Sequence, residues 1–170
     1  VEAFDKAIEF DPKSAQAVFS RGQALAELGR DDDAIQAFTR TLELDSTWYD
    51  AAHLRGVAQL RLGKYTDAIR SFDYALEHAP EFASAHYHKG RALQALGKYD
   101  KAIRSYKQAL TGDNTLVDAV YQTGLSYAEL GDYENALTAF DKMLEFSPDN
   151  SQVHFQKGRA LTRLERYDDS

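Results

Sequence analysis

Small and apolar residues recur along this chain at one fixed spacing. The clearest series is a glycine that returns at equal steps throughout, at Gly22, Gly56, Gly90, Gly124 and Gly158. An alanine follows each of the first four glycines at a constant distance, at Ala34, Ala68, Ala102 and Ala136, and Ser170 holds the fifth place. An aromatic residue stands four positions after each alanine, at Phe38, Phe72, Tyr106 and Phe140. A fixed period of this length predicts one supersecondary unit that is stacked on itself.

The apolar spacing within each unit predicts two helices. Small and apolar residues at Ala85, Ala92, Leu93 and Leu96 fall on one face of a helix. A second glycine series, at Gly29, Gly63, Gly97 and Gly131, supplies the left-handed residue that favours a helix C-terminus. Acidic residues then open the second helix, where the helix dipole stabilises them. We expect first helices at 15–28, 49–62, 83–96, 117–130 and 151–164, and second helices at 1–10, 32–45, 66–79, 100–111 and 134–146.

Four residues carry more specific expectations. Gly112 replaces the Leu or Phe of the sister copies, so we expect it to end its helix early and to leave a loose, weak joint to the next unit. Glu165 replaces the helix-ending glycine in the last copy, which predicts a less regular turn there. Gly90 and Ala102 are expected to form the close contact between paired helices, because only small residues let two backbones approach.

This combination of a small residue in the first helix, Ala-x3-aromatic in the second and Pro80 or Pro148 at the joint resembles the tetratricopeptide repeat. The resemblance implies an all-α fold, a right-handed superhelical solenoid of antiparallel helix pairs in one domain over 1–170. Its units would be a half repeat 1–14, full repeats 15–48, 49–82, 83–116 and 117–150, and a partial repeat 151–170. Two positions depart from the family pattern. The usual Trp, four before the glycine, is Val18, Ala52, His86, Val120 or His154, and the usual Leu, just before the glycine, is Arg21, Arg55, Lys89, Thr123 or Lys157.

Composition restricts the setting. The 170 residues include 27 acidic and 20 basic side chains, for a net charge of −7, and no cysteine. Disulfides and thiolate-metal sites are therefore impossible. No apolar run approaches the roughly 18 residues of a membrane span, and the first residues do not resemble a signal peptide. We expect a cytoplasmic location and no membrane partner, and we expect this sequence to be cut from a longer array.

The search for reactive groups predicts no enzyme. His53 and His88 lie on neighbouring first helices, but no carboxylate or cysteine completes a metal-binding set, so we expect no metal, no cofactor and no catalytic residue. Asp31, Asp32 and Asp33 are better explained as a helix N-terminus than as a cation site. The basic residues just before the glycines do not predict nucleic-acid binding, because the whole chain is acidic.

The resemblance further implies that the first helices line a concave face. Three residues before each glycine stands an aromatic or histidine ladder, which suits a recognition surface, although rings packed between repeats would give the same series. The predicted partner-binding groove is Phe19, Gln23, His53, Val57, Tyr87, His88, Arg91, Tyr121, Gln122, Leu125, Phe155 and Arg159. Over all inward positions, Arg61, Arg91, Arg159 and Arg163 balance Glu27, Asp50, Asp118 and Glu129, which predicts a nearly neutral groove.

These features favour a protein–protein interaction scaffold that binds a partner peptide or helix along the groove. One alternative is a targeting or substrate-selecting arm of a larger enzyme such as a glycosyltransferase, and another is a structural spacer. A receptor for carboxylate-ended chaperone tails, as in some members of the family, is disfavoured because the corresponding positions hold Phe19, Gln23, Leu54, Ser84 and His88. We expect a monomer in dilute solution. We also hypothesise head-to-tail stacking through the terminal half repeats, driven by exposed Val1, Phe4 and Ile8 at one end and Val153, Leu161 and Leu164 at the other.

Overall fold

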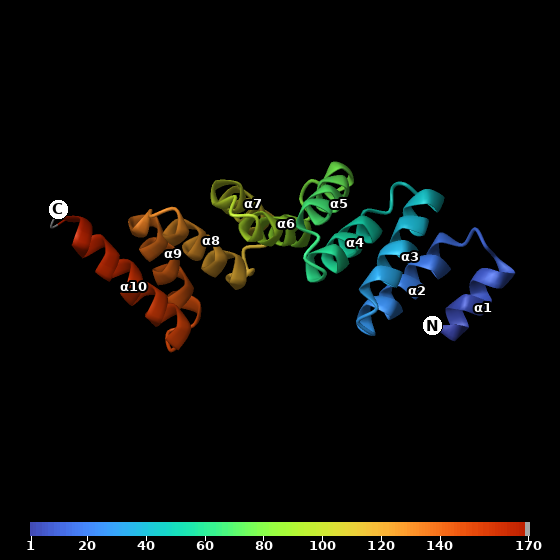
Figure 1. Cartoon of the computed structure of the whole chain (residues 1–170), viewed down its shortest axis with the longest axis horizontal. Helices are drawn as coiled ribbons and strands as arrows, with labels where there is room; N and C mark the ends of the chain where they lie inside the picture. Colours follow the sequence, from blue (N-terminus) through green and yellow to red (C-terminus); the bar gives the residue numbers. More distant parts are fainter. Residues whose placement is uncertain (169–170) are drawn as a thin grey trace.

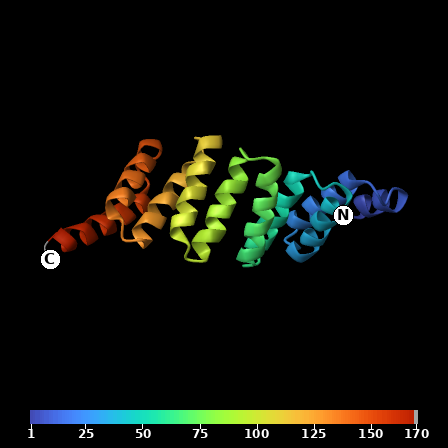
Figure 2. The same ribbon diagram turned by 90° about the horizontal axis from the view of Figure 1, so that it is seen from above.

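The chain folds into an elongated row of helices with its two termini at opposite ends (Figures 1 and 2). The computed structural model describes the backbone of residues 1–168 and the side chains of residues 1–165; all regular structure in this part is α-helical, so the alanine position predicted at Ser170 lies outside it. The helices are α1 (Glu2–Phe10), α2 (Ala15–Glu27), α3 (Asp31–Leu44), α4 (Tyr49–Arg61), α5 (Tyr65–His78), α6 (Ala83–Ala95), α7 (Tyr99–Gly112), α8 (Val117–Glu129), α9 (Tyr133–Phe146) and α10 (Ser151–Asp168). The all-α solenoid is confirmed.

Helix contacts follow chain order and place the first helices on the inside. Each helix packs against the next one in sequence, and in addition α2 touches α4, α4 touches α6, α6 touches α8 and α8 touches α10. No such contact joins successive second helices in the described residues. The even-numbered helices therefore form the inner layer, and the curvature of the stack brings their exposed sides together.

The recurring glycines admit an aromatic ring. A Cβ added at Gly90 would lie 2.5 Å from the Tyr106 ring, and the same atom at Gly56 would lie 2.6 Å from the Phe72 ring. Each of these rings is fully buried. The atoms nearest to a Cβ at Gly90 thus belong to Tyr106 and not to Ala102, because the small residue makes room for the aromatic side chain that faces it from the next helix.

The predicted helix-ending glycines are confirmed. Gly29, Gly63, Gly97 and Gly131 have φ between 69° and 80°, a conformation that costs other residues more than glycine. The turn at Glu165 differs from the expectation, because α10 continues as a helix through Asp168. Without a left-handed residue, nothing in the backbone interrupts the helix at this position.

The expectation for Gly112 is also wrong. Helix α7 includes Gly112 and has 14 residues, like α3, α5 and α9. A Cβ at Gly112 would lie 2.7 Å from the backbone oxygen of Glu81, so glycine allows the end of α7 to approach the preceding interhelical loop closely. The glycine therefore serves tight packing, and the structure gives no support to a loose joint at this place.

The terminal helices are less exposed than expected. Val153 is only 1% exposed and packs in the core with Phe140 and Met143. Val1 and Ile8 are half-buried against the first core cluster, since α1 packs on α2. Leu161 is 40% exposed, as expected, and the other large exposed apolar side chains on the terminal helices are Phe10 and Phe155.

Candidate functional site: a groove along the inner helices

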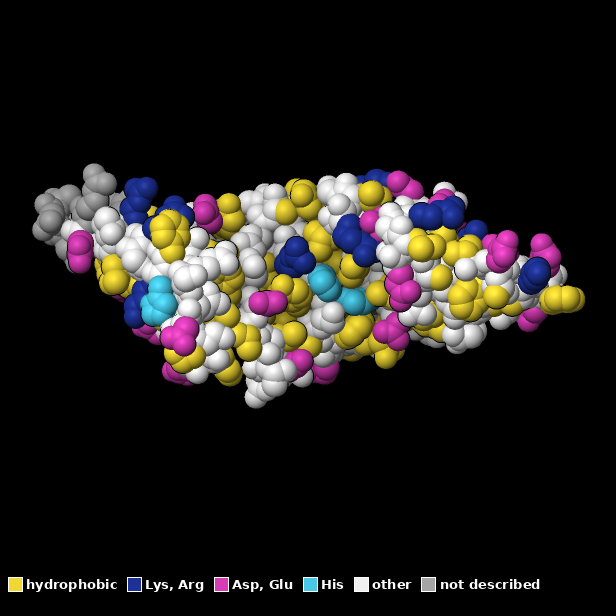
Figure 3. All heavy atoms as spheres, turned by 90° about the horizontal axis from the view of Figure 1, so that it is seen from below, with side chains coloured by type: hydrophobic (Ala, Val, Ile, Leu, Met, Phe, Trp, Pro, Cys, Tyr) yellow, Lys and Arg dark blue, Asp and Glu magenta, His cyan; other side chains and the backbone are white. Residues whose placement is uncertain are grey.

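Three hollows on the inner helices meet at Arg91. The largest, of about 810 Å³, lies between α6, α8 and α10, and its lining includes Gln122, Leu125 and Arg159. A second, of about 400 Å³, is lined by residues that include Tyr87 and Tyr121, and a third, of about 310 Å³, by residues that include Val57 and His88. Arg91 lines all three, so they form one groove from α4 to α10. Figure 3 shows one long face of the molecule, where Lys and Arg side chains lie among hydrophobic and histidine side chains near the middle.

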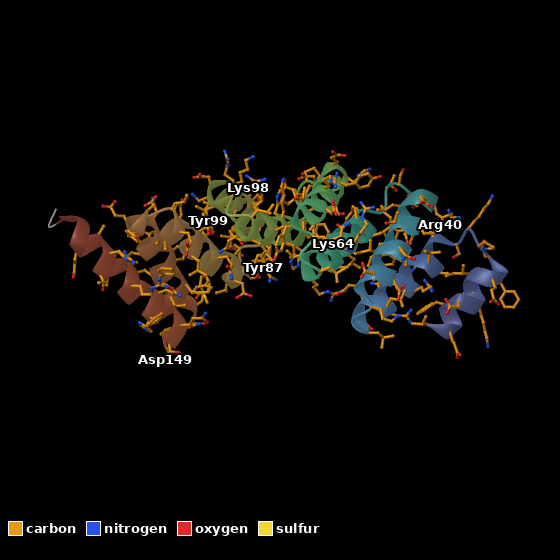
Figure 4. All side chains as sticks on the ribbon, in the orientation of Figure 1. Arg40, Lys64, Tyr87, Lys98, Tyr99 and Asp149 are labelled. Atoms are coloured by element: carbon orange, nitrogen blue, oxygen red, sulfur yellow. The ribbon has the colours of Figure 1, made fainter. Side chains whose placement is uncertain are left out.

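The two central tyrosines are half-buried in the wall of this groove. The ring of Tyr87, which is labelled in Figure 4, lies 6.0 Å from the Tyr106 ring, and the ring of Tyr121 lies 6.1 Å from that of Phe140. Burial raises the pKa of the Tyr87 phenol, although the nearby Arg91 opposes the rise. Both tyrosines therefore support the repeat packing with one side of the ring and line the groove with the rest.

A histidine pair lies beside the groove, between α4 and α6. The rings of His53 and His88 are 5.4 Å apart, and Ser84 Oγ lies 3.1 Å from His53 Nε2. Burial lowers the pKa of each histidine to about 4, with a further contribution to His53 from His88 and to His88 from Arg91. Both rings are thus neutral at pH 7. The described residues contain no group of three or more His, Cys, Asp or Glu side chains that could hold a metal ion.

Several residues of the predicted groove lie elsewhere. Phe19 is 8% exposed and stacks on Trp48 at 5.0 Å, and His53 is also 8% exposed, so both belong to the packing between repeats. Gln23 is exposed on α2 but lines none of the hollows described above. Phe155 is 64% exposed and lines none of the three hollows; it lines a fourth one on α10 around Gly158, which shares Arg159 and Arg163 with the largest hollow. The structure therefore corrects the groove to its α4–α10 part.

A tyrosine series that the sequence reading missed completes the lining. Tyr65 lines the third hollow, and Tyr99 and Tyr133 line the largest one. They are the first residues of α5, α7 and α9 and recur at the same spacing as the glycines. The period alone could have found them, but the family resemblance directed attention only to the first helices.

The groove is more basic than expected. Its three hollows include Arg61, Arg91, Arg159 and Arg163 but only two acidic residues, Asp118 and Glu129. The expected counter-charges Glu27 and Asp50 line none of the three. Arg61 pairs with Asp31, whereas no ion pair within the described side chains involves the other three arginines. A locally positive groove on an acidic chain attracts partners of the opposite charge.

The basic residues just before the glycines face away from this groove and join neighbouring repeats. Arg21 pairs with Asp5 at 2.6 Å and Lys89 with Asp73 at 2.6 Å, in both cases with the second helix of the preceding unit. Arg55 has Thr39 in the place of that acid and donates to Ser71 at 3.0 Å instead. These cations are held by contacts within the stack, as the acidic balance of the chain suggested.

Comparison with protein families agrees with the geometry. A family model described as tetratricopeptide repeat matches residues 1–51 and 53–116, and a second model with the same description matches residues 117–150. A search of curated protein sequences finds no match to this chain. No helix within residues 1–168 combines the length and the apolar character needed to cross a membrane.

Solved structures share this arrangement. The crystal structure of MamA is 25% identical, with a TM-score of 0.84 over 89% of this chain and 88% of its own. YrrB, described as a TPR protein with an unusual peptide-binding site, is 24% identical, with a TM-score of 0.85 over 96% of this chain and 84% of its own. The first TPR domain of Spaghetti (RPAP3), solved with the HSP90 peptide SRMEEVD, is 22% identical, with a TM-score of 0.68 over 71% of this chain and 95% of its own. At these identities, the last two comparisons establish the fold.

Proposed function

Because the chain belongs to the tetratricopeptide repeat family, we propose that it is a non-enzymatic scaffold that binds a segment of a partner protein along the groove from α4 to α10. The observation that carries this proposal is the joining of three hollows at Arg91 into one continuous groove. Peptide binding by the structural neighbours YrrB and RPAP3 adds support.

Different groove residues are suited to apolar, hydrogen-bonding and charged contacts with the partner. Leu125 and the exposed faces of Tyr87 and Tyr121 offer apolar contact area, which is where binding energy concentrates in interfaces. Gln122 and Gln156 lie two residues before successive glycines, so they repeat along the groove. Each side-chain amide both donates and accepts, which suits the main chain of an extended peptide. Arg91 and Arg159 then supply charge-assisted contacts to acidic side chains of the partner.

Ala95→Trp is expected to abolish binding without loss of the fold. Ala95 is exposed at the end of α6 and lines both the largest and the third hollow, so an indole at this place fills the groove and removes no internal contact. A random peptide library displayed on phage would be selected on the wild-type chain. The enriched peptides would then be measured by fluorescence anisotropy, with an expected loss of affinity of at least tenfold in the variant.

Gln108→Trp is the matched control for that experiment. Gln108 is exposed on α7 and lines none of the hollows described on the inner helices, so the variant should bind as the wild type does. Equal affinity of the Ala95→Trp and Gln108→Trp chains for the selected peptides would reject the groove as the binding site.

We also propose that the 170-residue polypeptide is monomeric when dilute and stacks head to tail when concentrated. An open hollow of about 440 Å³ lies around Gly158. A Cβ added at Gly158 would therefore meet nothing within 4 Å. Every equivalent glycine in the inner repeats faces an aromatic ring, and Phe4 occupies the repeat position of those rings. Sedimentation velocity should show concentration-dependent association that Gly158→Trp removes by filling the hollow. Equal association by this variant, or a discrete dimer only, would reject the stacking.

A further inference from the structure

Another hollow, of about 460 Å³, lies between α5, α6 and α7 and shares no residue with the groove. Its rim is strongly basic and its floor is apolar. The charged lining residues are Arg70, Lys89, Lys98, Lys101 and Arg104, against the single acid Asp73. The apolar ones are Ile69, Leu93 and Leu96. This is an unusual concentration of positive charge on a chain whose net charge is −7.

The positive charge arises because α7 has a lysine at the repeat position where α3 and α5 have an aspartate and α9 has Asn135. In α3, Asp33 pairs with Arg30 at 2.7 Å, and in α5, Asp67 pairs with Arg70. The residue at the same repeat position in α7 is Lys101. In this repeat Lys98 corresponds to Arg30 and Arg104 corresponds to Arg70. The lysine at position 101 therefore leaves both cations without the aspartate that pairs with their counterparts.

The preceding repeat does not supply the missing negative charge either. One repeat earlier, Lys64, the counterpart of Lys98, pairs with Asp32 of the preceding unit at 2.7 Å. The corresponding neighbour of Lys98 is the uncharged Thr66, which lines the same hollow. No ion pair within the described side chains involves Lys98, Lys101 or Arg104. Asp100 lies in the same helical turn but does not line the hollow.

This arrangement is unfavourable for the isolated chain. Lys98 and Lys101 lie at the N-terminal end of α7, where the helix dipole favours negative charge. Three unpaired like charges on successive turns of one helix also repel one another. Where a sequence breaks a local rule that two of its sister copies keep, and places a cation there, the departure points to a binding function. Figure 4 labels Lys98 and Tyr99 at the start of α7; Lys98 lines this hollow, whereas Tyr99 lines the groove.

The apolar floor indicates the class of partner. Leu96 is 37% exposed and Ile69, half-buried, also lines the hollow, whereas Leu93 is only 5% exposed, so a partner with apolar side chains gains contact area mainly at Leu96. A nucleic-acid backbone would gain nothing from this floor and would be repelled by the acidic chain as a whole. We propose that the hollow between α5 and α7 docks an acidic amphipathic segment of a partner protein, whose carboxylates pair with Lys98, Lys101 and Arg104 and whose apolar side chains cover Leu96.

Lys101→Asp is the decisive variant, because it introduces the aspartate of α3 and α5 and supplies a partner to Lys98 and Arg104. Aspartate is already accommodated at this position in α3 and α5, so the variant should fold at least as stably as the wild type, as circular dichroism would check. The probe is a fluorescein-labelled helical peptide of four turns with leucines on one face and glutamates on the other. Its dissociation constant, measured by anisotropy at low salt, should rise at least tenfold in Lys101→Asp.

Two controls separate this surface from a general charge effect and from the groove. Lys142→Asp changes the charge by the same amount at an exposed position of α9 that lines none of the hollows described, and it should alter affinity less than twofold. Ala95→Trp obstructs the groove and should leave binding of this probe unchanged. Equal weakening by Lys142→Asp, loss in Ala95→Trp, or tighter binding of an oligothymidylate of the same length than of the peptide would each overturn the proposal.

Discussion

Replacing Gly90 by alanine is expected to destabilise the stack by about 1–3 kcal/mol. The added methyl group would lie 2.5 Å from the Tyr106 ring, which is fully buried and has no free space into which to move. The hydroxyl of that ring donates to Gln94 Oε1 at 2.6 Å, which further fixes its position. Urea denaturation followed by circular dichroism would measure the effect as a lower midpoint.

Gly158→Ala is the matched control and should change stability in the opposite direction. Gly158 has the same repeat position within a helix, but a Cβ there meets nothing within 4 Å. Alanine favours a helix over glycine by about 1 kcal/mol, so this variant should be as stable as the wild type or more stable. A higher urea midpoint in both variants would show that the aromatic ring does not require the glycine.

Acidification from pH 7 to pH 5 is expected to weaken the middle of the stack through His53 and His88. Their pKa values are about 4 in the folded chain against about 6.5 for a free histidine, because burial disfavours the charged rings. The unfolded chain therefore binds more protons throughout the range between pH 6.5 and pH 4, and stability falls as the pH falls. Above pH 7 both states are neutral at these residues and the effect vanishes. We expect a loss of roughly 3 kcal/mol for each of the two histidines on reaching pH 4.

The double variant His53→Gln, His88→Gln isolates this effect. Its urea midpoint should vary much less between pH 7 and pH 5, a range that lies above the usual titration of carboxylates and leaves ion pairs such as Asp31–Arg61 intact. His154→Gln removes an exposed histidine on α10, outside this pair, and serves as the control for the substitution itself. The same pH dependence in the double variant as in the wild type would assign the loss of stability to other groups.

The candidate site could be predicted only in part from the sequence. The family resemblance, applied at the repeat spacing, implied that Tyr87, Arg91, Tyr121, Gln122 and Leu125 are groove residues, and all of them line it. The same reasoning wrongly placed Phe19 and His53 on its surface.

A period gives residues the same environment only when their neighbours also repeat. The ring of Trp48 covers Phe19, and the ring of Phe82 lies 4.7 Å from that of His53. The next repeat has Leu116 at this position, which leaves Tyr87 half-buried and able to line the groove. The exposure of each aromatic or histidine side chain in this series therefore depends on the residue at a second repeat position, and that residue differs between the copies.

The periodicity alone determined the helix pairs, their order and their stacking, because each unit buries its apolar face only against its neighbours and local pattern is then sufficient. Tertiary packing decided which group lies against each small residue, namely an aromatic ring at Gly90 and a neighbouring loop at Gly112. It also decided which charges have partners. Ion pairs between repeats join side chains that are far apart along the chain, so Lys89 is neutralised while Arg91 and Lys101 are left without a counter-charge among the described side chains. These contacts depend on the curvature of the stack and the directions of long side chains, which composition and spacing do not contain.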